Sequence, residues 1–435
     1  MKRLLLAMLL VSVVLPETSG RRAAAEPIAR AAGSPWKTDV DILHAARYSG
    51  DYGSFSKGHV YVDAQDRLWL PVNVFFPDKQ SHTDAFHPRE KQILLMSRDK
   101  GLTWTISERP SPAPIHNRVT LPDGTLIELG GTGWLRYPRS EIKRLQDTGY
   151  YVWDLGEKEG YCAIIYDLWQ KRSTDAGRTW QKRPLHKQLP FFAHFVARGP
   201  LRRLDNGTLI YLGYGYGKDD RKFNADSGSN RWESGRSHVY CLRSTDAGKT
   251  WNAIRAADGQ LSPSGQGFTE TFPIIGGQGK LFLMLRTGLG SPAFTVSSSD
   301  SGKTWTTAVR TPINAKHPLP TLLDDGTIVC SYQRRTAAPF GVRARFTSDR
   351  GKTWSAEIVL RDDVPTSDAL SEPDTVEFSD GTLFTAFQGK RFDDQGRQQQ
   401  FIGGSHWSRD YRQPYAPKLK VPPPRNKFNS KSAKP

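Results

Sequence analysis

The chain has 435 residues, of which 37% are hydrophobic and 24% charged, and its formal net charge at pH 7 is +17. This apolar content excludes a wholly disordered chain, and the lack of repeated long apolar runs excludes a multi-span membrane protein. The basic excess favours an anionic partner, such as an acidic glycan, a nucleic acid or an anionic surface.

Residues 1–25 have the features of a secretory signal peptide. Lys2 and Arg3 precede twelve apolar residues, 4–15, and a small-residue cleavage site follows at 23–25. A membrane-spanning helix needs about 20 apolar residues, so we expect no membrane span. We expect a secreted or periplasmic protein, for which an acidic glycan is a better partner than nucleic acid.

One eight-residue pattern, Ser/Thr-x-Asp-x-Gly-x-Thr-Trp, occurs five times. Asp and Ser side chains bond to nearby backbone amides and hold a tight turn, and Gly adopts backbone angles that other residues resist. The Trp then buries a large ring against a neighbouring strand. We therefore expect structural turns and not catalytic elements. The copies are 97–104, 173–180, 244–251, 298–305 and 347–354, and a degenerate sixth begins at Ser408.

A second repeat, a tight turn followed by an apolar strand, mostly alternates with the first. The six turns begin at Asp66, Asp123, Asn206, Gly279, Asp325 and Asp380. Asp-Gly and Asn-Gly between apolar runs indicate hairpins, so the pattern predicts six blades of four strands. The last blade runs out of chain, and we expect 40–43 to close the ring. Residues 131–162 form the longest insertion, expected to be a loop over or beside the pocket with a short helix near 141–145.

These eight-residue turns resemble the Asp boxes, or BNR repeats, of the sialidase superfamily, and the resemblance spans roughly residues 50–410. It implies an all-β fold, a six-bladed β-propeller of the sialidase type, here as one domain over 36–413. The basic, Pro-rich residues 414–435 contain no acid and are expected to be disordered.

Equivalent positions of the blades predict the central site. The residue eleven places before the apolar residue after each turn should begin the inner strand and face the central channel. Most of these residues are charged or imidazole, which predicts a polar centre that binds anions. They are Lys57, Ile115, Arg198, Glu270, His317 and Glu372, with His116 as an alternative to Ile115. Five places beyond the same reference lie Asn73, Gly131, Tyr214, Arg286, Gln333 and Gln388.

Two arginines are candidates for binding a substrate carboxylate. Arg286 and Arg335 each precede an Asp box by twelve residues, and a guanidinium binds a carboxylate as a bidentate fork. In sialidases a glutamate lies about as far before the second arginine of a substrate-binding triad as Glu270 lies before Arg286. The resemblance also implies an acid/base aspartate on a first-blade loop, for which Asp84 is the candidate and Asp78 the alternative.

Two departures from the sialidase pattern stand at the site. Glu372 occupies the place of the family's nucleophilic tyrosine, and Lys57 is nearest the place of its first arginine. Glu270 and Glu372 are separated by one blade and could face each other as the paired carboxylates of a glycoside hydrolase. The basic residues could instead neutralise both carboxylates and leave only a binding site.

Three functions therefore stay open: an exo-acting glycoside hydrolase on a terminal, anionic sugar such as sialic acid, a non-catalytic glycan-binding propeller, and a polysaccharide lyase on uronic acids. In the lyase, His317 or Tyr214 would act as the base. The hydrolase is preferred, because of the polar ring and the Glu270–Arg286 spacing. We expect a monomer without metal or organic cofactor. Cys162, Cys241 and Cys330 lie in apolar, strand-like stretches and are expected to be small core residues.

Overall fold

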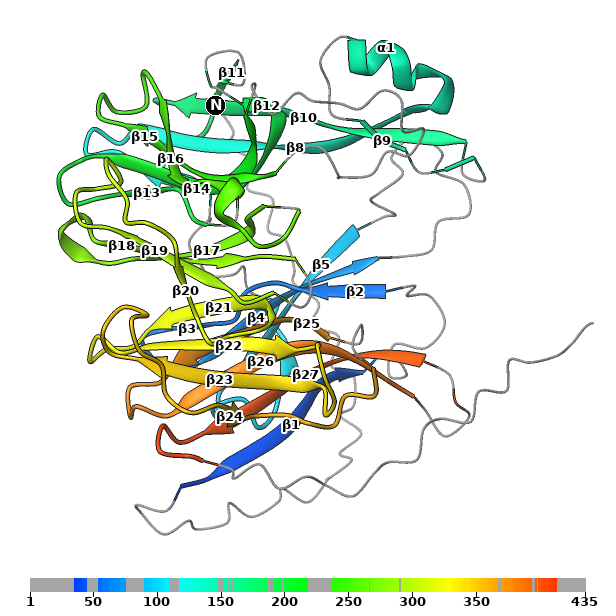
Figure 1. Cartoon of the computed structure of the whole chain (residues 1–435). Helices are drawn as coiled ribbons and strands as arrows, with labels where there is room; N and C mark the ends of the chain where they lie inside the picture. Colours follow the sequence, from blue (N-terminus) through cyan, green and yellow to red (C-terminus); the bar gives the residue numbers. More distant parts are fainter. Residues whose placement is uncertain are drawn as a thin grey trace, which may run out of the picture. The chain divides into compact units, whose positions relative to one another are not determined.

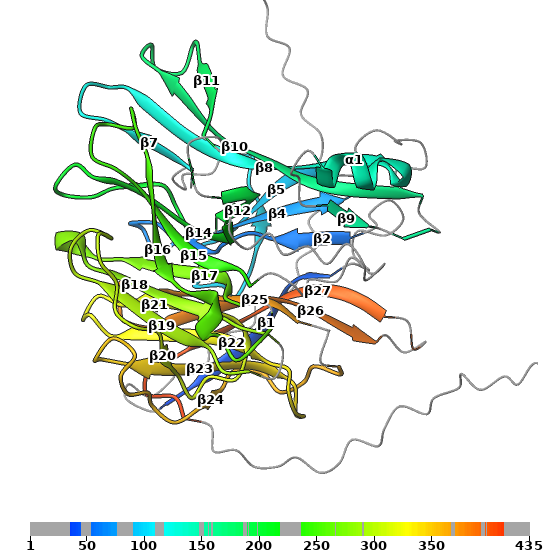
Figure 2. The same cartoon turned by 45° about the horizontal axis from the view of Figure 1, so that its top comes forward.

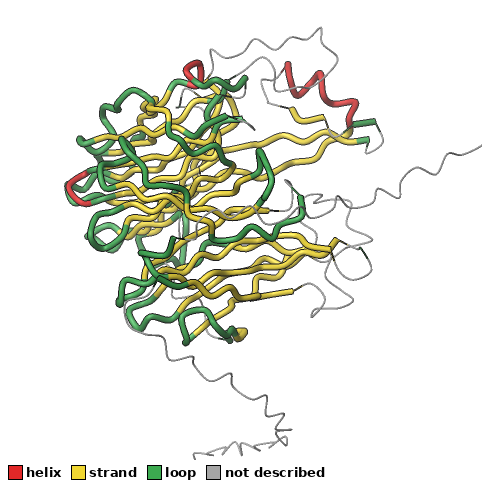
Figure 3. Tube along the Cα trace, turned by 60° about the horizontal axis from the view of Figure 1, so that its bottom comes forward, coloured by secondary structure: helices red, strands yellow, loops and turns green. Residues whose placement is uncertain are grey.

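The computed structural model describes residues 35–44, 54–75, 90–108, 117–147, 152–154, 156–157, 160–185, 189, 191–197, 199–217, 236–265, 267–288, 291–366, 370–392, 396 and 398–412. Strands predominate in this part of the chain (Figure 3), and they form six antiparallel sheets of four or five strands. These sheets are the six blades of a β-propeller, as the two repeats predicted (Figure 1). The predicted signal peptide and basic tail lie outside the described residues.

The first three blades contain five strands each. Blade one consists of β2 (Ser54–Lys57), β3 (Tyr61–Val62), β4 (Leu68–Phe75), β5 (Glu90–Ser97) and β6 (Thr105–Ile106). Blade two consists of β7 (Arg118–Thr120), β8 (Leu126–Pro138), β9 (Val152–Asp154), β10 (Tyr161–Ser173) and β11 (Gln181–Pro184). Blade three consists of β12 (Phe191–Ala197), β13 (Arg202–Arg203), β14 (Leu209–Gly217), β15 (His238–Ser244) and β16 (Asn252–Ala257).

The last three blades contain four strands each. Blade four consists of β17 (Thr269–Ile275), β18 (Leu281–Arg286), β19 (Phe294–Ser298) and β20 (Val309–Arg310). Blade five consists of β21 (Lys316–Leu322), β22 (Ile328–Arg334), β23 (Gly341–Thr347) and β24 (Ile358–Val359). Blade six consists of β25 (Leu370–Glu377), β26 (Leu383–Phe392), β27 (Gln398–Trp407) and β1 (Lys37–His44).

The ring closes where β1, from the beginning of the propeller, pairs with β27 from its end. The backbone N–H of Trp36 donates to Oγ of Ser408 at 2.9 Å, and the N–H of Ser408 donates to the carbonyl of Trp36 at 3.0 Å. The expectation that residues 40–43 supply the missing strand is therefore confirmed.

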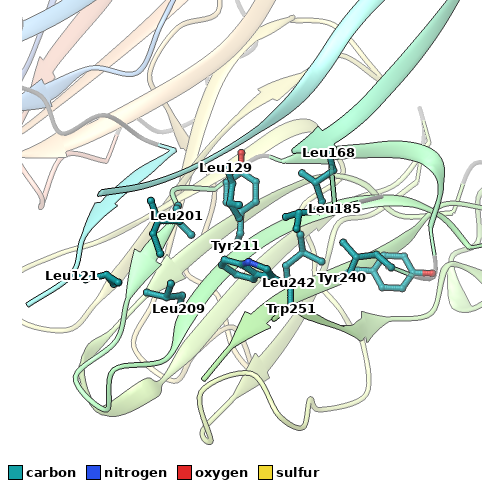
Figure 4. Packing of buried hydrophobic residues seen from close by; sticks show 12 residues of the cluster. Leu121, Leu129, Leu168, Leu185, Leu201, Leu209, Tyr211, Tyr240, Leu242 and Trp251 are labelled. Atoms are coloured by element: carbon teal, nitrogen blue, oxygen red, sulfur yellow. The ribbon is translucent and has the colours of Figure 1, made fainter. Parts of the chain in front are cut away.

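Apolar clusters fill the spaces between neighbouring blades. Between blades two and three, Leu129 on β8 and Leu209 on β14 pack around Trp251, the last residue of an Asp box (Figure 4). The Trp251 indole N–H donates to Oε1 of the buried Gln170 at 2.7 Å, so the large ring is buried with its polar atom satisfied. Burying such side chains removes apolar surface from water, which stabilises the packing of one blade on the next.

The Asp boxes form the tight turns that their composition predicts. In residues 173–180, the Ser173 hydroxyl donates to Oδ1 of Asp175 at 2.7 Å and accepts the N–H of Gly177 at 2.9 Å. The Thr179 backbone N–H donates to the same Asp175 oxygen at 2.9 Å. Gly177 has a φ of 87°, in the region that favours glycine. Side chains and backbone thus satisfy each other inside the turn, and the boxes hold the fold.

The insertion at residues 131–162 differs from the predicted loop. Most of it continues β8 and β10 as one long hairpin, paired from Leu126 with Ser173 to Pro138 with Tyr161 (Figure 2). The chain then passes through η2 (Arg139–Glu141), α1 (Ile142–Asp147) and β9, so the short helix is confirmed. The residues at 130, 131 and 133 are glycines, which are disfavoured in strands, but the long cross-strand pairing overrides that local preference.

The three cysteines are buried and free. Cys241 and Cys330 belong to the clusters between blades three and four and between blades four and five, as small core residues. Two short 3₁₀ turns, η6 (Gly259–Leu261) and η7 (Gly277–Gly279), complete the described elements. In the part of the chain that is described, no helix has the length and apolar character to cross a membrane.

Candidate functional site

Four predicted site residues lie on the first strands of their blades: Lys57 on β2, Glu270 on β17, His317 on β21 and Glu372 on β25. The last three occupy β-bulges. In blade four, two residues, Glu270 and Thr271, lie between the pairs that flank Leu285 of the partner strand. His317 and Glu372 lie at the same kind of register shift in blades five and six. A bulge redirects the side chain of the extra residue, so the three blades turn these polar groups away from the regular pleat.

Two of these bulges hold a backbone conformation that side chains disfavour. Glu270 has a φ of 43° and His317 a φ of 49°. Non-glycine residues seldom adopt positive φ, and such strain gathers at functional sites where the surrounding structure enforces it. Glu270 and His317 are therefore held for their position and not for the local stability of their strands.

The side chains from blades four, five and six meet at His317. Its Nδ1 lies 3.1 Å from Oε2 of Glu270 and 3.4 Å from Oε1 of Glu372. Arg286, on β18 of blade four, forms an ion pair with the same oxygen of Glu270. Four predicted residues therefore form one cluster, in which an imidazole lies between two carboxylates.

Lys57 brings a buried positive charge from blade one. Its backbone N–H donates to Oε1 of Gln388 at 3.1 Å, which fixes blade one against blade six, and its Nζ donates to the carbonyl of Gly58 at 3.2 Å. Burial lowers the pKa of Lys57, and the negative charges of Asp374 and Glu372 only partly oppose the shift. Lys57 therefore lies within electrostatic range of Glu372.

Further positive charge surrounds Glu270. Burial lowers the pKa of Lys316, and the neighbouring charges of Arg286 and Arg335 lower it further, whereas Glu270 raises it. The charge of Arg335, immediately after β22, thus reaches the residue next to His317. Lys316, Arg286 and Arg335 make this side of the cluster electropositive.

His59 and Asp374 are site residues that the sequence analysis missed. Nδ1 of His59 lies 3.0 Å from Oδ2 of Asp374, and this oxygen also accepts the backbone N–H of Val60 at 2.9 Å. Each residue follows a predicted one by two positions, Lys57 in blade one and Glu372 in blade six. Closeness in the chain to a predicted site residue was therefore the signal that could have found them.

The other predicted residues are not brought into this cluster by the contacts described. Asp84 and Arg198, with the alternatives Asp78 and His116, lie outside the described residues. Tyr214, on β14, packs against the core between blades three and four. Among the described residues, no three or more His, Cys, Asp or Glu side chains form a group suited to hold a metal ion.

Comparison with known proteins identifies the repeat and the fold. Residues 150–318 match the family model of the BNR repeat-like domain. A protein of unknown function from Dyadobacter fermentans DSM 18053 is 23% identical with a TM-score of 0.55, over 85% of this chain and 97% of that one. The Hadza microbial sialidase Hz136 is 16% identical with a TM-score of 0.44, over 84% and 67%.

A third solved structure is Trypanosoma rangeli sialidase in complex with sialic acid, 15% identical with a TM-score of 0.47 over 86% of this chain and 59% of that one. No curated protein matches the sequence. The predicted resemblance to BNR-repeat proteins is confirmed by the repeat match over residues 150–318. A fold of this kind does not by itself determine a function, so the function has to be argued from the site.

Proposed function

We propose that the protein is an exported, exo-acting glycoside hydrolase that removes a terminal anionic sugar, with a sialoside as the first substrate to test. The observation that carries the proposal is the convergence of Glu270 and Glu372 on His317. Paired carboxylates at the scissile bond are the usual machinery of glycoside hydrolysis. Glu372 stands where the sialidase pattern has its nucleophile, and we assign it attack on the anomeric carbon.

Attack by Glu372 on the anomeric carbon predicts retention of configuration, because water then displaces Glu372 from the same carbon in a second inversion. A glycosyl ester on Glu372 is the intermediate that this proposal requires. Because both distances end on Nδ1 of His317, the contacting oxygens of Glu270 and Glu372 lie at most about 6.5 Å apart, so the charge of Glu270 is close to the attacking carboxylate.

Glu270 has an electrostatic role in the proposal. It forms an ion pair with Arg286, and a fixed negative charge stabilises the positive charge that develops at the anomeric carbon. Arg286 has five N–H donors, so it can hold Glu270 and still bind a substrate carboxylate. Lys57, Lys316 and Arg335 add the positive potential that favours an anionic sugar.

A glycan-binding propeller is the second candidate, and one observation favours it. Each carboxylate already has a basic neighbour, Arg286 and His317 for Glu270, and His317 for Glu372. Such mutual neutralisation would hold a polar recognition surface without chemistry. Turnover separates the two functions, because a binding protein releases no product.

The test is release of a fluorophore from sialic acid, arabinose, uronic acid and rhamnose glycosides by the mature protein. Glu270→Gln and Glu372→Gln should each lower kcat by at least about 10²-fold, because each removes a charge needed in the transition state. Glu157→Gln is the matched control, since the side chain of Glu157 is 88% exposed and lies in the turn between β9 and β10.

Each outcome of this panel has a defined meaning. Release from the sialoside by the parent and by Glu157→Gln, lost in both site variants, supports the proposal. Release of only another sugar would support the hydrolase proposal but exclude a sialoside as the substrate. An unsaturated product absorbing ultraviolet light would replace the hydrolase with a lyase. If no glycoside releases product but the protein still binds glycans, the glycan-binding function is supported and the hydrolase is excluded.

A further inference from the structure

His59 and Asp374 form a hydrogen-bonded pair that joins blade one to blade six. Nδ1 of His59 is 3.0 Å from Oδ2 of Asp374, and the Val60 backbone N–H donates to this oxygen at 2.9 Å. Asp374 is also buried. Burial and these two contacts together hold its carboxylate in one orientation. A carboxylate that accepts from Nδ1 fixes the orientation of the imidazole and leaves Nε2 as the nitrogen that gains and loses a proton.

The pair is exposed on one side only. The side chain of His59 is 44% exposed, whereas that of Asp374 is 11% exposed. The carboxylate is thus shielded while the imidazole remains accessible to a ligand. A proton-transfer group needs this arrangement, because the transferring atom has to reach the substrate while the orienting group stays in place.

The charges around His59 favour its protonated form. Burial alone lowers the pKa of His59, but the charge and hydrogen bond of Asp374 outweigh it, with help from Glu372 and against the charge of Lys57. The net result is a raised pKa. Because an ordinary histidine already titrates near neutral pH, His59 carries a proton over more of the physiological range.

In the described cluster Glu270 is paired with Arg286 and His317, and His317 also contacts Glu372. The side chain of His317 is 13% exposed, whereas that of His59 is 44% exposed, so His59 is the more accessible of the two imidazoles. Departure of a sugar from an ordinary alcohol needs a proton on the leaving oxygen. We propose that the His59–Asp374 pair is the acid–base group of this site, an inference that rests on the proposed hydrolase function.

The proton balance of the reaction is simple. His59 gives its Nε2 proton to the glycosidic oxygen as the bond from this oxygen to the anomeric carbon breaks, and the electron pair stays on the oxygen. A carboxylate oxygen of Glu372 bonds to the anomeric carbon. Water then displaces Glu372, whose bonding electrons return to the carboxylate, and the proton lost by the water returns to His59. One water is consumed and no other reactant is needed.

The test compares two leaving groups on the sugar that the protein cleaves. A nitrophenolate departs without a proton, whereas an alkyl alcohol does not. His59→Gln should lower kcat/KM for the alkyl glycoside by about 10²–10⁴-fold and for the nitrophenyl glycoside by less than about tenfold. Asp374→Asn should move the basic limb of the pH profile to lower pH, because it removes the charge that raises the pKa of His59.

A measurement without substrate accompanies the kinetics. NMR titration of the imidazole nitrogens should show a raised His59 pKa in the parent protein and a lower one in Asp374→Asn. If His59→Gln lowers kcat/KM equally for both glycosides, His59 is a structural residue and its acid–base role is overturned. Selective loss on the alkyl glycoside in Asp84→Asn, but not in His59→Gln, would give the role to Asp84.

Failure of the hydrolase itself would look different. If the unmutated protein releases no sugar from any glycoside, the hydrolase proposal and the catalytic role of His59 both fall, even where NMR shows the pair. If the parent is active and the His59 variant keeps full activity on the alkyl glycoside, only the role of His59 falls.

Discussion

His317 and Glu372 come from adjacent blades, and Nδ1 of the imidazole lies 3.4 Å from Oε1 of the carboxylate. Neither strand could place its residue there with a regular pleat, because each residue occupies a bulge. Glu270 contacts the same imidazole from blade four. The relative positions of blades four, five and six therefore determine the spacing of Glu270 and Glu372, and His317 lies between them.

Replacing His317 should reduce activity without loss of the fold. His317→Asn removes the imidazole and keeps a residue that tolerates positive φ, so we expect kcat to fall by about 10²-fold with little change in the free energy of unfolding. His317→Val removes the same group but adds a β-branched residue at a φ of 49°. It should lower the free energy of unfolding, measured with urea, by about a further 1–3 kcal/mol. Equal stability of the two variants would contradict the proposed strain.

The ion pair between Arg286 and Glu270 should be needed as a unit. Both side chains are largely buried, at 13% and 14% exposure. Arg286→Met leaves Glu270 without its guanidinium and should lower the free energy of unfolding by about 3 kcal/mol. Combining it with Glu270→Gln should recover most of this loss, because no uncompensated charge remains. Additive losses in the double variant, measured by urea unfolding, would show that the two charges are not coupled.

Much of the fold was predictable because its signals are local and repeated. The Asp boxes satisfy their own hydrogen bonds within eight residues, so each can be read without knowing its neighbours. Closure of the ring by β1 followed from counting strands. The long hairpin of β8 and β10 was not predictable, because its stability comes from cross-strand pairing, whereas the glycines at 130, 131 and 133 are locally unfavourable in a strand.

The site was predictable in position and less so in its contacts. One offset from each hairpin turn selected Lys57, Glu270, His317 and Glu372, because the blades repeat. The same offset could not show that Arg286 is engaged by Glu270 or that Asp374 reaches His59. Those contacts join different strands or blades, and their distances depend on how the blades pack, which no single repeat encodes.

The three thiols should be unreactive in the folded protein. Burial raises the pKa of Cys241 to about 12 and raises that of Cys330 further, and the attacking species in thiol chemistry is the thiolate. A disulfide reagent should therefore modify fewer than one thiol per chain in native buffer and three in denaturant. Rapid native labelling, located by peptide mass spectrometry, would show that one of these strands opens.

The Asp boxes should make stability depend on acid pH. Hydrogen bonds from the Thr179 hydroxyl and backbone, and from Ser173, lower the pKa of Asp175 to about 2, and Thr353 and Thr347 act in the same way on Asp349. An aspartate in the unfolded chain has a pKa of about 3.9. Because the folded pKa is the lower one, protonation favours the unfolded chain. The boxes therefore contribute their full stability above about pH 5 and lose it as the pH falls through about 4 toward about 2.

Urea unfolding midpoints measured from pH 6 to pH 2 test this expectation. The midpoint should stay level above about pH 5 and fall steadily below about pH 4, as the box carboxylates take up protons only on unfolding. Thr179→Val and Thr353→Val keep the shape of the side chain but remove the hydroxyl donor, so the folded pKa of each aspartate rises toward the unfolded value. The double variant should have a lower urea midpoint at pH 6, and its midpoint should fall less steeply below pH 4. A slope equal to that of the parent would assign the acid sensitivity to carboxylates outside the boxes.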